Sequence, residues 1–223
     1  MSLAELARDD AAGIDAIASF LDALAPADRV VEARSLNRDE QRRLYAKAIV
    51  ARPLGLEDFV PSSIGPHSQV IHYGRNTLHL PDRLQLFEKR FCRPDGATDR
   101  LFGYNASPFE RSVGPGFFVA VPTSGHTEWE GRGAVVVDYF RIPEGPTVEG
   151  WPAVVPNTKG LQRFVYHRTR DFMRRVSVHV TIGAAFREER PLDHYFVLCR
   201  EGSSSVPTAS LGSKPSVVAQ GPG

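Results

Sequence analysis

Five segments between residues 117 and 200 decide the fold: FFVAV (117–121), AVVVDYFRI (134–142), LQRFVYHRTRDFMRR (161–175), VSVHVTI (176–182) and YFVLCR (195–200). Four of them are rich in valine, phenylalanine and tyrosine, which is typical of β-strands. The third has apolar residues at helical spacing and predicts one long amphipathic helix. Two strands, one helix and two more strands indicate an α+β protein, because a parallel α/β sheet would alternate strands with helices.

A pair of helices is expected near the N-terminus. Apolar residues from Ile14 to Leu24 follow helical spacing, and Pro26 is expected to stop that helix. Asn37 and Glu40 have the spacing of a helix cap, so a second helix is expected to begin there and to end before Pro53.

The remaining strand candidates lie between these helices and residue 117. They are a short apolar run at 70–73, the second half of 84–92, and 101–105. The sequence therefore predicts an α+β fold with a curved, mainly antiparallel sheet of about six or seven strands, barrel-like if the sheet closes. The helix at 161–175 and the N-terminal helix pair are expected to pack on this sheet.

Length and composition indicate how many domains the chain has and which partners it is expected to lack. Its 223 residues suffice for one large domain, which is expected to span residues 1–203. Residues 204–223 are rich in serine, glycine and proline and lack aromatic residues, so they predict a disordered tail. The formal net charge of +1 argues against a nucleic-acid partner and against a membrane partner.

The two cysteines, Cys92 and Cys199, lie in strand-like runs and are expected to be core thiols. The chain starts without a cationic segment followed by an apolar run, and no stretch approaches about 18 apolar residues. A cytoplasmic location is therefore expected.

Three charged residues are expected on apolar surfaces. Alternation along a strand places Lys89 on the same face as Phe87 and Phe91. The same rule places Asp138 among Val136 and its alternate neighbours, and helical spacing places Arg168 in the apolar stripe of 161–175. Arg168 is thus expected to be better protected than Arg170 or Arg174.

Because a lone buried charge costs several kcal/mol, Lys89, Asp138 and Arg168 are expected within reach of one another. They would form either a polar-ligand site or a structural ion pair, unless the cationic stems extend to the rim. The face of Asp138 stays open, since the alternate residues Val135, Val137 and Tyr139 are also apolar.

Familiar catalytic and metal motifs are not found in the sequence. His67, His72 and His79 match no metal-ligand spacing and are interpreted as surface or turn residues. The chain has no Gly-x-Ser-x-Gly elbow. Gly114-Pro115-Gly116 is interpreted as a backbone turn rather than a phosphate-binding loop. No metal site is predicted, and the sequence leaves a cofactor unknown.

Four strings together resemble a group of uncharacterised bacterial proteins: FEKRFCRP (87–94), VGPGFFVAVP (113–122), RRVSVHVTIG (174–183) and DHYFVLCRE (193–201). The similarity covers most of residues 53–200. It implies no activity and carries over no catalytic residue.

The function expected from the sequence is binding of a small, partly apolar ligand between helix and sheet. Lys89, Asp138 and Arg168 would be the polar anchors, and Tyr104 would contribute to the apolar lining or act as a packing anchor. One alternative is a protein-interaction module that uses the arginine-rich face of 161–175. Another is an enzyme with Asp138 or a histidine as general base. The sequence does not indicate an oligomeric state.

Overall fold

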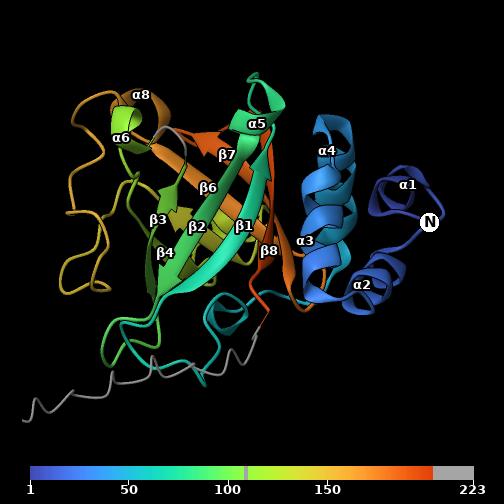
Figure 1. The fold of residues 1–223 in the computed structure, drawn as a ribbon, viewed down its shortest axis with the longest axis horizontal. Helices are drawn as coiled ribbons and strands as arrows, with labels where there is room; N and C mark the ends of the chain where they lie inside the picture. The colour runs from blue at the N-terminus through green and yellow to red at the C-terminus, as the bar shows by residue number, and fades with distance from the viewer. Residues whose placement is uncertain (108–109, 203–223) are drawn as a thin grey trace, which may run out of the picture.

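The computed structural model of the chain describes residues 1–107 and 110–202, without the side chains of residues 111 and 112. Within these residues, eight strands form one closed barrel in which every strand pairs antiparallel with its neighbours in sequence, and β1 pairs with β8 (Figure 1). The strands are β1 Val70–Asn76, β2 Leu86–Cys92, β3 Leu101–Ala106, β4 Phe118–Pro122, β5 Val135–Asp138, β6 Thr169–Arg175, β7 Val180–Arg187 and β8 Arg190–Arg200.

The α+β class and the antiparallel sheet are confirmed, and the sheet closes into a barrel. The expected count of six or seven strands is wrong, because the segment predicted as a helix supplies β6. The predicted tail, residues 204–223, lies outside the described residues.

The prediction of a long helix at 161–175 was wrong. The segment forms only a short helix, α8 Gln162–Val165, and then becomes strand β6. On β6, Phe172 packs outward against Trp129 while Met173 packs into the barrel core, so both faces of the strand are buried. A strand buried on both faces shows no clean alternation of apolar and polar residues, and its spacing resembled that of a helix.

Helices α3 and α4 pack on the outer surface of the barrel against β1, β7 and β8, and α1 packs against α2, α3 and α4, farther from the barrel (Figure 1). The predicted helix pair is confirmed as α2 and α4, and the cap of α4 forms reciprocal bonds of 3.1 and 2.8 Å between Asn37 and Glu40. Pro26 begins a further helix, because proline fits the first helical turn. Their bounds are α1 Leu3–Arg8, α2 Ile14–Asp22, α3 Pro26–Ser35 and α4 Arg38–Lys47.

The barrel interior has two halves. One half is an apolar core that includes Phe91, Leu101 and Phe118, closed by Leu56 and Phe59 from the segment before β1. That segment contains two single turns, η1 Ala48–Val50 and η2 Leu56–Asp58.

The other half of the interior lies toward three short helices that gather at one end of the barrel (Figure 1). These helices are α5 Asp82–Gln85, α6 Glu110–Val113 and α8. On the outer wall, α7 Thr127–Glu130 brings Trp129 against Phe172.

The two cysteines are buried free thiols, as predicted. Burial raises the pKa of Cys92 to about 12 and that of Cys199 to about 11. Neither thiol is therefore poised as a nucleophile at neutral pH.

No helix in the described part of the chain is both long enough and apolar enough to cross a membrane.

Candidate functional site

A cavity of about 680 Å³ occupies the half of the barrel next to α5, α6 and α8. Its walls are mainly apolar and aromatic, and it reaches down to a polar floor. The apolar lining includes Leu84, Phe87, Val113, Tyr166, Leu192 and Phe196.

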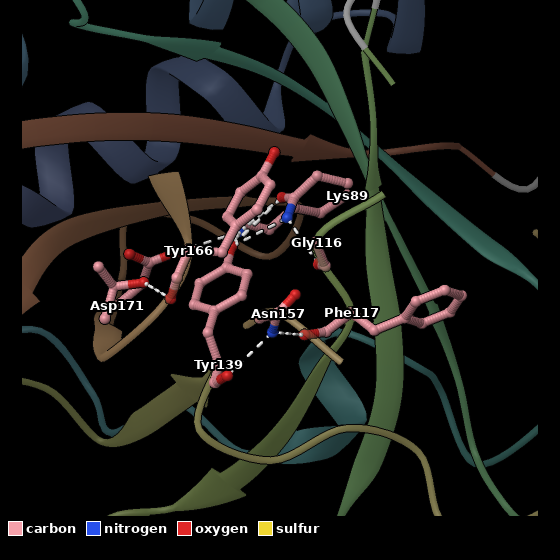
Figure 2. Close-up of polar contacts among 9 residues, drawn as sticks. Lys89, Gly116, Phe117, Tyr139, Asn157, Tyr166 and Asp171 are labelled. Atoms are coloured by element: carbon pink, nitrogen blue, oxygen red, sulfur yellow. Dashed lines mark hydrogen bonds and ion pairs between the residues drawn. The ribbon is translucent and has the colours of Figure 1, made fainter. Parts of the chain in front are cut away.

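Lys89 lies at the floor of this cavity and is buried. Its Nζ donates to Asn105 Oδ1 at 2.9 Å and forms an ion pair with Asp171 Oδ2 at 3.2 Å. A third hydrogen bond runs to the Tyr139 hydroxyl (Figure 2). The three ammonium donors of Lys89 are therefore all engaged.

The partners of Lys89 also hold one another. Asn105 Nδ2 donates to the carbonyl of Gly116 at 3.0 Å, and the Tyr139 hydroxyl lies 3.2 Å from Asp171 Oδ2. No polar side-chain atom of Lys89, Asn105, Tyr139 or Asp171 is both buried and without a partner in the described structure. These four residues, called the floor network below, form a closed set of hydrogen bonds.

Tyr166 stacks on Tyr139 with ring centroids 5.2 Å apart, and so connects the floor to the cavity wall (Figure 2). Gly116 passes directly beneath the Tyr166 ring with a φ of 56°, and an added Cβ would lie 2.4 Å from that ring. The turn at Gly114-Pro115-Gly116 thus permits a close approach of backbone to ring. Asn157 Nδ2 fixes the same region by donating to the carbonyls of Phe117 and Tyr139 (Figure 2).

Burial controls the electrostatics of the floor. It lowers the pKa of Lys89 and raises the pKa of Asp171, while the attraction between the two charges opposes both shifts. Burial also raises the pKa of Tyr139 well above its ordinary value, so its phenol stays protonated. The floor therefore carries no net charge, whether the pair is ionised or neutral.

The opposite end of the cavity, called the mouth below, is lined by Arg187, His194 and His79. Arg187 ends β7, and His194 lies on β8 beside an irregularity in the β7–β8 register. Burial and the nearby charge of Arg38 lower the pKa of His194, so its imidazole is mainly neutral at pH 7.

Lys89 is the one predicted anchor that lines the cavity. It shares the inner face of β2 with Phe87 and Phe91, as strand alternation predicted. Its role in ligand binding stays a prediction.

Asp138 lies on the other face of the sheet, which corrects the expectation that it would be near Lys89. Its strand neighbour Val137 is in the barrel core, so Asp138 points outward. There it is buried and contacts Arg170 Nε at 3.4 Å. The alternative left open by Val135, Val137 and Tyr139 is the one that the structure adopts.

The expected position of Arg168 was also wrong. It lies in the turn before β6 with a φ of 61°, and its exposed guanidinium pairs with Glu188 at 2.6 Å. It is more exposed than Arg170 or Arg174, the reverse of the prediction, because the helix that was to bury it does not form.

Tyr104 also faces outward. Its ring packs against Trp151 with a centroid distance of 4.9 Å and against Phe117 at 5.5 Å. Tyr104 is therefore a packing anchor on the outside of the barrel, which was one of its two expected roles, and it does not line the cavity.

The arginine-rich helical face of the interaction hypothesis is also absent from the described residues, because β6 replaces the helix. Arg170 and Arg174 lie on the outer face of β6. Arg175 points inward instead and forms an ion pair with Asp58.

Sequence reasoning missed Asn105, Tyr139 and Asp171. Asp171 was assigned to a helix, where nothing marked it as a partner of Lys89. The interpretation of His72 as a surface or turn residue was wrong, since it is buried in β1 and its Nε2 bonds the Phe59 carbonyl at 2.9 Å. Alternation from Val70 would have placed His72 on the inner face.

Among the described residues, no group of three or more histidine, cysteine, aspartate or glutamate side chains is arranged to hold a metal ion. Comparisons of the chain with protein families, with curated proteins and with solved structures find no match.

Proposed function

We propose that the barrel binds a small, partly apolar molecule in the cavity above Lys89. The observation that carries the proposal is the combination of an apolar cavity of about 680 Å³ with a small set of fixed polar groups. Ligand sites in proteins commonly measure about 300–1,000 Å³ and combine these same features.

The floor network favours binding over covalent chemistry at Lys89. A lysine nucleophile must be neutral and must present its lone pair to the substrate. Lys89 Nζ is instead surrounded by Asn105, Tyr139 and Asp171, so a substrate atom would have to displace one of them. The network acts as a rigid polar base against which a ligand packs.

The proposal includes a cytoplasmic setting. Cys92 and Cys199 are buried thiols that the structure leaves unpaired, which fits a reducing compartment. The resemblance to uncharacterised bacterial proteins stays a prediction.

The test fills the cavity and measures loss of binding. N-phenyl-1-naphthylamine is an uncharged fluorescent probe that should enter the cavity of the native protein. Ala185 lines the cavity beside Asp171, its register partner on the neighbouring strand, so Ala185→Phe should reduce the affinity for the probe by at least about tenfold. Fluorescence titration measures the affinity, and thermal melting checks the fold.

Ala16→Phe on the exposed surface of α2 is the matched control and should bind like the native protein. Equal probe affinity of Ala185→Phe and the native protein would contradict the proposal, as would absence of binding to the native protein.

A further inference from the structure

The two ends of the cavity differ in how fully their polar groups are used. At the floor, the four network residues satisfy one another. At the mouth, buried nitrogen atoms of Arg187 and His194 have no hydrogen-bond partner in the described structure. A buried polar atom without a partner costs free energy, so the polar groups of the mouth are less fully satisfied than those of the floor.

Arg187 is held in place by the protein but carries an uncompensated charge. Its Nη2 donates to the carbonyls of Phe164 and Val165 at 2.9 and 3.3 Å, which fixes the guanidinium at the mouth. Within the described residues, no carboxylate pairs with it, and its Nε is buried without a partner. A guanidinium held this way is suited to bind an anionic group.

His194 is directed into the same space by the β-bulge. The register between β7 and β8 shifts at Ala185 and Phe186, where Asp193 adopts a φ of 52°. A bulge of this kind re-aims the side chains beside it. His194 lines the cavity at the mouth, and its Nδ1 has no hydrogen-bond partner in the described structure.

The carboxylates near the cavity are already engaged. Asp171, the one carboxylate among the described cavity-lining residues, pairs with Lys89. Asp193, next to the mouth, pairs with Arg38 at 2.6 Å. The mouth thus retains the positive charge of Arg187, whereas the floor is neutral as a unit.

We propose that the ligand is an amphipathic organic anion that enters the barrel with its apolar body first. Its acidic group lies at the mouth against Arg187 and His194, and its body packs between Phe87, Tyr166 and Phe196. The reverse orientation would bring the acidic group against the floor, where the charge of Lys89 is already paired with Asp171. This inference rests on the proposed function and names the chemical class of its ligand.

The test compares two probes with the same apolar body. 1-Anilinonaphthalene-8-sulfonate carries a sulfonate that N-phenyl-1-naphthylamine lacks. The native protein should bind the sulfonate at least about tenfold more tightly, because a charge-assisted hydrogen bond is worth more than a neutral one. Arg187→Gln should remove most of that gain and change the affinity for the uncharged probe by less than about twofold.

Arg190→Gln is the matched control, since Arg190 lies opposite Arg187 in the same hairpin but is exposed and outside the cavity lining. It should bind both probes like the native protein. His194→Leu leaves the contacts of Arg187 with Phe164 and Val165 in place. It should also lower the affinity for the sulfonate probe alone. Ala185→Phe should lower the affinity for both probes, which distinguishes binding in the cavity from adsorption to the surface.

Equal affinity of the native protein for the two probes would overturn the inference of an anionic ligand while leaving the proposed cavity binding intact. Equal weakening of both probes by Arg187→Gln and by His194→Leu would also overturn it. If neither probe binds the native protein, the proposed function itself is overturned.

Discussion

Asp171→Leu is expected to lower the free energy of unfolding by about 3–5 kcal/mol, because it leaves the buried ammonium of Lys89 without its counter-charge. The network around Lys89 offers two neutral partners, Asn105 and Tyr139, which do not replace a carboxylate. Denaturant titration of the native and variant proteins measures the loss.

A double variant distinguishes a buried ion pair from simple loss of packing. Lys89→Met combined with Asp171→Leu removes both charges and should recover most of the stability that the single variant loses. Asp10→Leu is the matched control, since Asp10 forms an exposed pair with Arg43, and it should cost less than about 1 kcal/mol. A double variant no more stable than Asp171→Leu would contradict this account of the floor.

Acidification is expected to destabilise the fold through His72. Burial lowers the pKa of His72 in the folded protein from 6.5 to about 3. Its Nε2–H donates to the Phe59 carbonyl and its Nδ1 is buried without a partner, which fits a neutral imidazole. The unfolded chain therefore binds a proton at His72 at a higher pH than the folded protein does.

The sign and window of this effect follow from linkage. Above about pH 6.5 the imidazole is neutral in both states, so His72 contributes no pH dependence. Between about pH 6.5 and 3 the unfolded state takes up the proton and stability falls by about 1.4 kcal/mol per pH unit. The full loss near pH 3 is about 4–5 kcal/mol.

His72→Phe tests this assignment. The His72 ring already packs edge-on against Phe91 at 4.9 Å, and phenylalanine has no proton to gain. Denaturant titrations at several pH values should show a weaker fall in stability below pH 6.5 for the variant than for the native protein. The same slope in both proteins would show that another group causes the acid sensitivity.

The strands that the sequence predicts well are those with β-branched or aromatic residues on one face. Lys89 could be placed on the inner face because Phe87 and Phe91 alternate with it and both pack inward. The capping pair Asn37 and Glu40 could be predicted because a helix cap depends only on residues close in sequence.

The errors arise where both faces of the barrel wall are buried. Asp138 could not be assigned to a face, since Val136 outside and Val137 inside are equally apolar. Strand β6 has arginines on its outer face that are held by packing and carbonyl contacts, as with Arg174 and the carbonyl of Tyr45 at 2.7 Å. Such long-range contacts leave no local signal, so Asp171 could not be recognised as the partner of Lys89.

The mouth of the cavity could not be predicted from the sequence either. It depends on barrel closure between β1 and β8 and on the placement of α8 by Arg187, which are contacts between residues far apart in the chain. Arg187 and His194 acquire their shared position only from the β7–β8 pairing.

A crystal structure of the protein with N-phenyl-1-naphthylamine would show whether the barrel holds a ligand. The naphthalene ring should lie inside the barrel between Phe87, Tyr166 and Phe196, above the floor network, which keeps its hydrogen bonds. A probe found only on the outer surface, for example against the exposed Val31 of α3, would contradict the proposed site.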